Sequence, residues 1–487
     1  MEAATKTDLF RGEWFLPGRQ IMFPGVVAEE PKTGKLFLSL YTSENLDGTA
    51  LGHGRASYPI ILGNALHQTP VTLYNCTWRG TKYIGTRFAE ITYQIDVIID
   101  GAQYDKEDDI MVKSVLVEFP IFANWYDRGE ADEKLQRHLR TNKIDSKIAE
   151  ELVQIDANLS VAYVEHVNET NMLYEQSIEY KYNKWVDFRY SNDVPFERAR
   201  EDWFNYARLL EFTTGKRIAH TVIRLILNAT KSIKHRSIIK EREHIPMPCI
   251  VYNHYKNIDA SGRFIHQNSM LFSSWKMDKD QLNNITRAWF KNRELYPIYD
   301  YYLDSNNWFE NTTARLSNVM FNNRFLNLIQ GLEAYHTRLN DEYAADYENF
   351  TTNRDRISGL INEPELKIWF VKHVNYSPKF HLVQRLEGLL SRYEQVLNAL
   401  FGGTAILKSF PTEARDYRNK LSHGMLKETN LGDDVRVCYL SAQLLLCICV
   451  LESLAIDQGA ITKILAHNSQ YQPTVMEIRK AKSISKR

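Results

Sequence analysis

The chain has 487 residues, of which 44% are hydrophobic and 25% charged, and this composition is typical of a soluble globular protein with two or three domains. It excludes a disordered chain and a collagen-like repeat. Lysine and arginine together number 60, as do aspartate and glutamate, so no overall charge indicates a nucleic-acid partner and any basic surface has to be local.

Cysteine usage and hydropathy indicate a cytoplasmic protein. The five cysteines form no CxxC pair and no Cys/His cluster at zinc spacing, and their odd number favours a reducing compartment. The first ten residues lack the apolar core of a signal peptide. The most apolar run, Leu440–Ile456, contains polar residues and is too short to span a bilayer. We therefore expect no metal site, no cofactor and no membrane partner.

The first 120 residues predict strands and turns. Lys35–Thr42 follows the turn-forming segment Pro31–Gly34. Ile91–Ile99 and Met111–Phe119 alternate in part between apolar and polar residues and are rich in β-branched side chains. This pattern predicts a sheet with one face exposed to water.

Further strands and one long helix are expected before residue 260. The charged stretch 128–160 could hold a short helix. The later elements are strands near Ser160–Val167 and Ile178–Phe188, a helix at Phe196–Phe212, and strands at Thr221–Leu227 and Pro248–Tyr252.

The most basic segment lies between the last two of these strands. It contains Lys231, Lys234, Arg236, Lys240 and Arg242 against two glutamates. One interpretation is a solvated hairpin loop. The other is a contact with phosphate or another acidic partner, which makes Lys234, Arg236 and Lys240 candidate RNA-binding residues.

The character of the sequence changes near residues 255–280, where we place a domain boundary. The expected division is a β-rich domain at 1–270, a helical domain at 280–470 and a basic tail at 471–487. The aromatic residues of Asp280–Tyr302 are expected in the core of the helical domain.

Two helices show clean periodicity of 3.6 residues. Apolar residues recur at spacings of three and four in both: Phe321, Phe325, Leu328, Leu332, Tyr335 and Leu339 in one, and Leu382, Leu386, Leu389, Tyr393, Leu397 and Leu400 in the other. Gly402-Gly403 ends the second helix. A third helix at Val435–Ile456 is apolar nearly all round and should be buried, and a short one at Thr412–His423, with Ser409 or Thr412 as N-cap, precedes it. Together these four helices predict a bundle.

The short helix ends in the sequence Arg418-Asn419-Lys420-Leu421-Ser422-His423, followed by Gly424. Asn419 and His423 are four residues apart and share a helix face. Arg418 and His423 are five apart and diverge by about 140° on an ideal helix. They can bind one ligand only if the helix ends there, as Gly424 permits, or if a second chain completes the site. Arg415, one turn earlier, adds a second cation.

These residue types suit the cleavage of RNA. A phosphodiester beside a 2′-hydroxyl breaks by internal attack, which needs a proton acceptor and donor with a pKa near neutrality and a cation on the phosphorane. Histidine supplies the first and arginine the second. The alternative is structural: Arg418 pairs with a carboxylate of the bundle while His423 caps the helix C-terminus. No Walker-type loop, dinucleotide signature or HExxH motif is present.

The segment Arg415–Gly424 resembles the catalytic motif of HEPN-domain ribonucleases in its Arg-Asn form. Phe325–His336 and Phe380–Leu390 resemble helices of one branch, the ApeA-like HEPN proteins. That branch carries a β-rich N-terminal domain. The resemblance therefore implies an α+β protein in which a β-rich N-terminal domain precedes an all-α HEPN-type bundle.

The resemblance also implies an activity and partners. It implies a metal-independent endoribonuclease of bacterial anti-phage defence that acts by abortive infection, with HEPN domains paired in a homodimer or higher homo-oligomer. By position, Arg418 would bind the scissile phosphate, His423 would move protons and Asn419 would orient the site, with Arg415 and Lys420 as RNA-binding residues. The N-terminal domain would sense or regulate, responding to a phage-derived trigger.

A second function stays open at this point. The helical domain could be a non-catalytic HEPN-type module that binds a nucleotide or a partner, or that only dimerises. Glu333 and His336 have no role in either reading and are expected to be bundle residues.

Overall fold

The computed structural model describes residues 6–484 except 20, 32, 43–55, 67–68, 85–87, 120, 127–132, 134–146, 173–176, 217, 219–221, 229–230, 234–245, 254–266, 306–317, 340–341, 375–380, 404–406 and 423–432. The chain forms two compact units. The first comprises Met1–Glu211, Arg217–Gln267 and Ser273–Asp278, and the second comprises Phe212–Lys216, Asn268–Phe272 and Lys279–Arg487.

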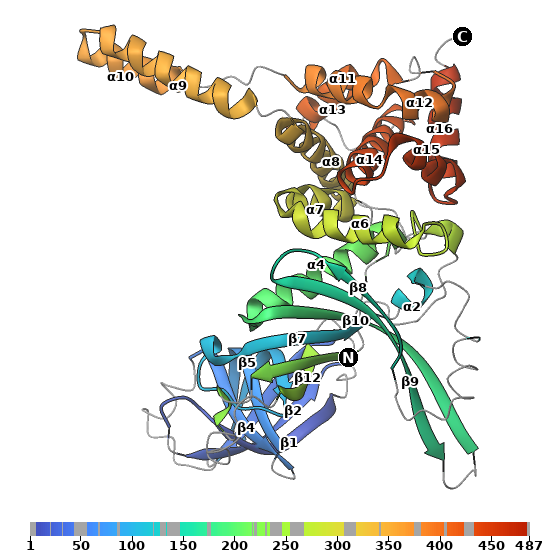
Figure 1. The fold of residues 1–487 in the computed structure, drawn as a ribbon. Coiled ribbons are helices and arrows are strands. Elements are labelled where there is room, and N and C mark those ends of the chain that lie inside the picture. The colour runs from blue at the N-terminus through green and yellow to red at the C-terminus, as the bar shows by residue number, and fades with distance from the viewer. Residues whose placement is uncertain are drawn as a thin grey trace. The chain divides into compact units, whose positions relative to one another are not determined.

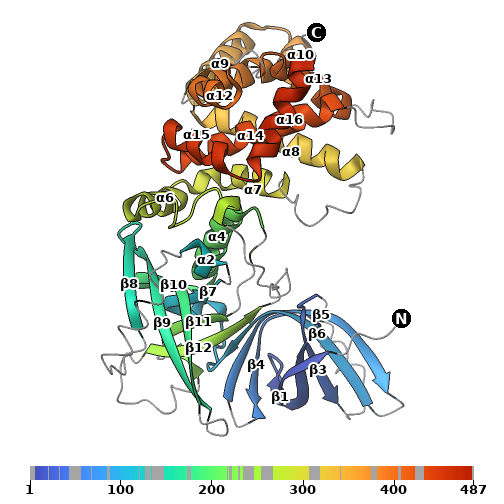
Figure 2. The ribbon, with the colours of Figure 1, turned by 90° about the vertical axis from the view of Figure 1, so that its right-hand side faces the viewer.

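The first unit begins with a closed six-stranded barrel (Figure 2). Its strands are β1 (Thr7–Phe15), β2 (Met22–Glu29), β3 (Leu36–Thr42), β4 (Tyr58–Ala65), β5 (Thr69–Ile84) and β6 (Phe88–Asp100). They follow the order β3-β2-β1-β4-β5-β6, and β3 pairs with β6 to close the ring. The strand predictions for 35–42 and 91–99 are confirmed, and alternate residues of β3 and of the first part of β6 are buried, as expected for a sheet with one face toward water. The closure of this sheet around Trp14, Leu38 and Tyr93 was not predicted.

Strand β6 pairs with two different strands, β3 and β12, along the same edge. Residues 89–95 pair with β3, and Val97–Asp100 pair with β12. The burial of β6 follows this change: alternate residues are buried through the first part, and then Val97, Ile98 and Ile99 are all buried. One continuous hydrogen-bonded sheet therefore leads from the barrel into the rest of the unit.

The outer strands extend this sheet in the order β12-β11-β7-β10-β9-β8 (Figures 1 and 2). They are β7 (Met111–Glu118), β8 (Lys147–Gln154), β9 (Leu159–Met172), β10 (Ser177–Pro195), β11 (Val222–Asn228) and β12 (Pro246–Asn253). The strands expected at 111–119, 160–167, 178–188, 221–227 and 248–252 are confirmed. A short helix at 128–160 is wrong for residues 147–154, which form β8, and most of 128–146 lies outside the described residues.

Helix α4 (Phe196–Thr214) confirms the predicted helix, and α2 (Phe122–Trp125) is a single turn. Aromatic side chains gather between them and the outer strands. Phe122 stacks on Tyr126 with ring centroids 5.4 Å apart, and Tyr163 and Tyr206 complete the group. Short 3-10 turns occur at Glu107–Asp109, Gln267–Ser269 and Arg293–Leu295.

The second unit is helical. Its helices are α6 (Lys279–Lys291), α7 (Tyr296–Ser305), α8 (Asn318–Leu339), α9 (Glu342–Leu360), α10 (Pro364–His373), α11 (Leu382–Arg392), α12 (Glu394–Phe401), α13 (Phe410–Ser422), α14 (Asp433–Ser453), α15 (Gln458–His467) and α16 (Tyr471–Ile484). Four of the six aromatic residues of α6 and α7 lie in the core as expected, with Trp289 stacked on Tyr299, and Tyr296 and Tyr301 are half-buried. The helix predicted from Leu382 to Leu400 is two helices, broken at Tyr393. Gly402 ends α12 in the left-handed conformation, with φ of 74°.

Helix α14 is the central member, as its apolar sequence predicts. It packs on α7, α8, α13, α15 and α16, and Leu440, Leu444 and Leu451 are fully buried. By length and hydropathy alone its window 434–453 could cross a membrane, so the apolar run is longer than the sequence indicated. However, 89% of that window is buried inside the protein, as in a core helix.

The expected basic tail is a packed helix over most of its length. Tyr471, Val475 and Ile478 are buried along one side of α16, and α16 packs on α12, α14 and α15. Its basic residues Arg479 and Lys480 are exposed. A basic composition therefore did not distinguish this helix from a loose tail. The ranges 1–270 and 280–470 stay predictions as functional domains.

Candidate functional site

The Arg-Asn motif lies at the exposed end of α13. The helix begins directly after Ser409, whose carbonyl accepts the Glu413 N–H at 3.0 Å, so Ser409 and not Thr412 precedes the first turn. Phe410, Pro411 and Ala414 are buried where α13 packs on α8, α11 and α14. The described helix ends at Ser422, one residue before His423. The described motif residues thus form the C-terminal end of α13, and the placement of His423 stays a prediction.

Four predicted site residues, Arg415, Arg418, Asn419 and Lys420, are exposed on α13. Arg415 forms an ion pair with Asp416 at 2.8 Å, and both side chains are about half exposed, so the pair contributes little stability and leaves Arg415 open to a ligand. Arg418 has no ion pair with any residue that the structure describes. The alternative in which a bundle carboxylate neutralises Arg418 therefore has no support within those residues.

Tyr417, near this end of α13, is close enough to α14 to be influenced by its charge. Lys420 Nζ lies 5.6 Å from the centre of the Tyr417 ring. Burial raises the pKa of the Tyr417 phenol, and the Asp434 carboxylate raises it further. Asp434 belongs to the first turn of α14. The motif therefore lies beside the N-terminal end of the central helix.

The other predicted site residues lie outside the described residues. These are His423 and Gly424 after α13, and Lys234, Arg236 and Lys240 in the basic segment. The structure brings Arg415, Arg418, Asn419 and Lys420 together on one short helix. Whether His423 and the basic segment join them stays a prediction.

A second histidine, His336, lies in a buried cluster that the sequence analysis treated as ordinary core. His336 on α8 and Arg385 on α11 are 8% and 9% exposed. Arg385 Nη1 donates to the carbonyl of Glu333 at 3.2 Å and to the hydroxyl of Thr337. Burial lowers the pKa of His336, and the charge of Arg385 lowers it further, so the imidazole is held neutral.

Gly388 makes room for that imidazole. A Cβ at this position would lie 3.1 Å from Nε2 of His336. Glycine disfavours a helix, so a glycine three residues after an arginine in an otherwise strong helix is the sequence signal that could have located this contact.

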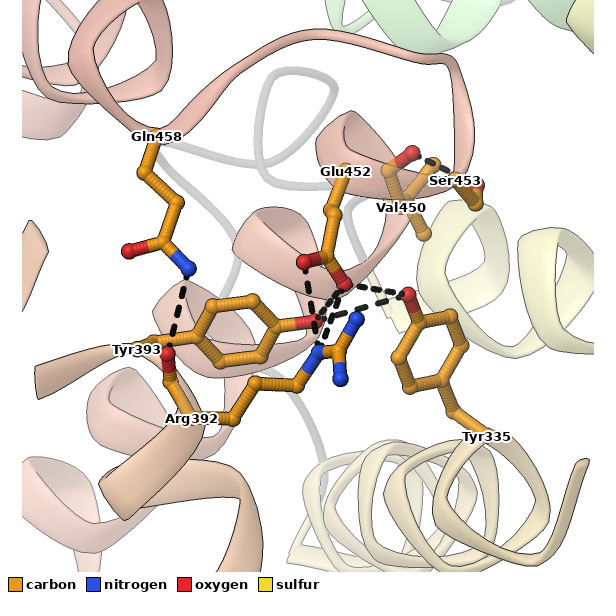
Figure 3. A network of polar contacts seen from close by, with 7 residues as sticks. All are labelled: Tyr335, Arg392, Tyr393, Val450, Glu452, Ser453 and Gln458. Atoms are coloured by element: carbon orange, nitrogen blue, oxygen red, sulfur yellow. Dashed lines mark hydrogen bonds and ion pairs between the residues drawn. The ribbon is translucent and has the colours of Figure 1, made fainter. Parts of the chain in front are cut away.

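A third polar cluster surrounds Glu452 at the C-terminal end of α14 (Figure 3). Its carboxylate accepts hydrogen bonds from Tyr393 at 2.7 Å, Arg392 Nε at 2.9 Å and Tyr335 at 3.1 Å. The hydrogen bond to Glu452 raises the pKa of Arg392. Gln458 donates to the carbonyl of Arg392 at 3.1 Å, which ties α15 to the same point.

The Glu452 cluster borders a cavity of about 480 Å³, which Arg338 and Asn292 also line. Along α14 it lies 18 residues from Asp434, or about 27 Å at the rise of an α-helix. The cluster is therefore separate from the motif on α13. Because every oxygen of Glu452 already has a partner within the protein, we interpret the cluster as a structural clamp.

Metal-ligating residues do not converge in the part of the chain that the structure describes: no group of three His, Cys, Asp or Glu side chains could hold an ion there. All five cysteines are free and buried. Burial raises the pKa of Cys447 to about 12, which keeps the thiol protonated and unreactive.

Comparison with family models adds to this geometry. Residues 10–289 match the model described as ApeA N-terminal domain 1, and residues 326–460 match the model described as Apea-like HEPN. The chain belongs to the ApeA-like HEPN proteins. No curated protein and no solved structure matches it. The resemblance to the ApeA-like HEPN proteins is thereby confirmed, and so is the order of a β-rich part followed by a helical one. The catalytic role of residues 415–424 stays a prediction.

The HEPN match contains all three polar clusters. It begins in α8 and ends in α15, so it includes the α13 motif, the His336–Arg385 pair and Glu452. Arg392 of the Glu452 cluster is also exposed, but its guanidinium is paired with Glu452. Arg418, in contrast, is an exposed cation without an ion pair to any residue that the structure describes. In this ApeA-like HEPN protein, α13 is therefore the candidate functional site.

Proposed function

We propose that this protein is a metal-independent endoribonuclease of bacterial anti-phage defence, acting in the cytoplasm by abortive infection. Membership of the ApeA-like HEPN family supports the defence role. The observation that carries the ribonuclease activity is the exposed Arg418, which has no ion pair with any described residue, beside exposed Asn419 at the end of α13, directly before His423.

Each residue of the motif has a distinct task in the proposed reaction. Arg418 binds the scissile phosphate, where its planar fork of donors matches two phosphate oxygens. His423 accepts the proton of the 2′-hydroxyl as its oxygen attacks phosphorus. The bond to the 5′-oxygen then breaks, and a protonated imidazole returns a proton to that oxygen. The products are a 2′,3′-cyclic phosphate and a 5′-hydroxyl, and Asn419 orients the site.

The proposed active form is a homodimer or higher homo-oligomer through the helical part. One imidazole cannot both accept and donate a proton at opposite ends of the reaction unless it moves. Arg418 and His423 also diverge by about 140° on a continuous helix. Two copies of the motif facing one cleft meet both requirements, since each copy contributes one histidine and one arginine.

The test is cleavage of labelled RNA by the purified protein in the presence of a chelator. Wild type is expected to produce 2′,3′-cyclic phosphate ends, and Arg418→Ala and His423→Ala are expected to lose cleavage and the growth arrest caused by expression. Arg356→Ala, an exposed arginine on α9, is the matched control and should cleave like wild type. Wild-type rates in both motif variants would refute the assignment.

The second candidate function is a non-catalytic module that binds a nucleotide or partner or only dimerises. It rests on the same family match, which identifies the HEPN domain but not its activity. The same assay separates the two functions, because a binding module retards labelled RNA or a nucleotide without producing new ends.

The proposed RNA contacts extend beyond the catalytic residues. Arg415 and Lys420 are exposed near Arg418, and Lys234, Arg236 and Lys240 form the basic segment of the N-terminal part, which we propose senses a phage-derived trigger. Neutralising Lys234, Arg236 and Lys240 together should weaken RNA binding and flatten its dependence on salt, because fewer counterions are released. An unchanged salt slope would remove these three residues from the RNA path.

A further inference from the structure

Helices α9 and α10 lie side by side (Figure 1). Both helices expose large apolar side chains. Six of these are between 44% and 75% exposed: Ile357, Leu360, Leu366, Ile368, Trp369 and Val371. No residue of α10 is buried, although half of its ten residues are apolar. Exposed apolar patches of this kind on a soluble protein mark interaction surfaces.

One stripe of α10 has a self-complementary order. Glu365, Ile368, Trp369 and Lys372 fall at positions i, i+3, i+4 and i+7, and so share one helix face about 100° wide. The half-buried residue of α10, Phe370, lies on the opposite side. The stripe therefore points away from the side on which α10 is covered.

We propose that this stripe binds the same stripe of a second copy, with the two α10 helices antiparallel about a twofold axis that passes between residues 368 and 369. In that arrangement Glu365 lies opposite the partner's Lys372, and Lys372 lies opposite the partner's Glu365. Ile368 and Trp369 meet the partner's Trp369 and Ile368 at the centre. The contact is isologous, as a twofold interface requires.

The charges of this stripe favour a second copy of the chain over other binding partners. The acidic residue Glu365 lies in the first turn of α10, and the basic residues Lys372 and His373 lie in the last turn. An antiparallel copy matches both ends at once and also opposes the two helix dipoles. A membrane surface would instead favour an excess of lysine and arginine, which this stripe lacks. Neither Glu365 nor Lys372 has an ion-pair partner within the described part of the chain.

The side chain of Trp369 is already held in place by contacts within α10. Its ring stacks on His373, with centroids 4.8 Å apart and planes at 20°. The Nδ1 atom of His373 lies 2.8 Å from the carbonyl oxygen of Trp369, within hydrogen-bond distance. A fixed aromatic side chain loses little entropy on binding. The stripe is only about 10 Å long, so we expect reversible association with a micromolar dissociation constant.

This interface does not depend on ribonuclease activity. It lies on α10, whereas the proposed catalytic pairing concerns α13. If copies also pair through α13, contacts between α10 helices join those dimers into larger assemblies. A wild-type protein that self-associates through α10 but does not cleave RNA would therefore refute the proposed function alone. A wild-type protein that cleaves RNA, with Glu365→Lys and Lys372→Glu variants that keep the wild-type mass, would refute the α10 interface alone.

The test is the mass of the full-length protein by sedimentation velocity between about 1 and 100 μM, the range expected for so short a contact. Glu365→Lys and Lys372→Glu each place like charges opposite one another twice per interface. Each should raise the dissociation constant about tenfold or more. The double variant Glu365→Lys/Lys372→Glu restores opposite charges and should return to wild-type association. Lys463→Glu, an exposed lysine on α15, is the control for net charge.

Two results would overturn the interface. One is that both single variants show the same mass distribution as the wild type. A wild type that stays monomeric over the whole concentration range would give this result too. The other is a double variant that associates no better than the single ones, because a partner other than a second copy could not be matched by reversing both charges. All three substituted positions are exposed, so loss of folding is not expected to obscure the result.

A disulfide experiment tests the position of the axis. Ile368→Cys should form a covalent dimer under mild oxidation, because facing residues of close-packed helices come within disulfide distance near a twofold axis. The five native cysteines are buried and should not contribute. Met476→Cys, at a residue 65% exposed on α16, is the control. Equal cross-linking of the two variants would contradict the proposed axis.

Discussion

The hydroxyl of Tyr393 donates a 2.7 Å hydrogen bond to Glu452 from the position at which α11 gives way to α12. Tyr393 is fully buried, and its backbone, at φ of −100° and ψ of 20°, departs from the α-helix. The bond therefore fixes the break between two helices to the end of the central helix α14.

Removing the Glu452 carboxylate, which accepts these hydrogen bonds, should destabilise the helical unit. We expect Glu452→Ala to lower the free energy of unfolding by about 2 kcal/mol, because the buried hydroxyls of Tyr393 and Tyr335 lose a partner. Denaturant unfolding of both proteins measures the difference. Glu477→Ala is the matched control: Glu477 pairs with Arg436 at 2.6 Å on the surface, and its loss should cost less than about 0.5 kcal/mol. Equal effects of the two substitutions would show that the Glu452 cluster is no clamp.

The neutral His336 should make stability depend on pH. Burial and Arg385 lower the pKa of His336 in the folded protein below the ordinary histidine value of 6.5, so the unfolded chain binds a proton more readily than the folded one. The stabilisation is complete above pH 6.5 and is lost as the pH falls toward the lower folded-state pKa. Unfolding midpoints at several pH values should fall less steeply below pH 6.5 in His336→Gln. The exposed His467→Gln variant should follow wild type, and a steep fall in both variants would assign the effect to other groups.

Two glycines in helices should respond oppositely to alanine. A Cβ at Gly359 on α9 meets nothing within 4 Å, so Gly359→Ala should stabilise the protein by up to about 1 kcal/mol through helix propensity. A Cβ at Gly331 on α8 would lie 2.8 Å from Cδ2 of Leu446 and 3.3 Å from Cβ of Tyr301, in the core. Gly331→Ala should cost about 1–3 kcal/mol. Thermal unfolding measures both, and a stabilised Gly331→Ala variant would contradict the close packing of α8 on α14.

Arg418→Ala should separate folding from function. The side chain is exposed and has no ion pair with a described residue, so its removal should change the free energy of unfolding by less than about 0.5 kcal/mol. Cleavage of RNA should nevertheless be lost. Denaturant unfolding and the cleavage assay are measured on one preparation. A large loss of stability would mean that Arg418 supports the bundle, in line with the structural alternative.

Much of the fold follows from local sequence patterns. Strands β3, β6 and β7 and helices α8, α13 and α14 lie where alternation, periodicity and apolar runs predict them. Barrel closure does not follow, because it depends on the pairing of Leu36–Thr42 with residues 89–95, and no local pattern encodes that partner. The break at Tyr393 was also missed, since its cause is Glu452, almost 60 residues later in the chain.

The site was predictable only in part. The exposed end of α13 follows from Arg418 and His423 being unable to share a helix face. The burial of His336 beside Arg385 does not, because it requires two helices to pack with Gly388 between them. The stripe on α10 was overlooked for a different reason. In sequence, Ile368-Trp369 resembles any core segment, and only the structure shows that these side chains are exposed.

The shared edge of β6 has a consequence for how the protein is made. All six barrel strands are contiguous in sequence, so the ring can close as soon as Asp100 has left the ribosome. The strand that joins the same edge next, β12, is translated about 150 residues later, after a delay of about 10–30 s at ordinary elongation rates. The backbone groups of Val97–Asp100 stay without that partner throughout the delay. During this interval the nascent chain can hold a closed barrel in which the β6 edge at Val97–Asp100 is still unpaired with β12. A chaperone or a neighbouring nascent chain could bind to that edge in the meantime.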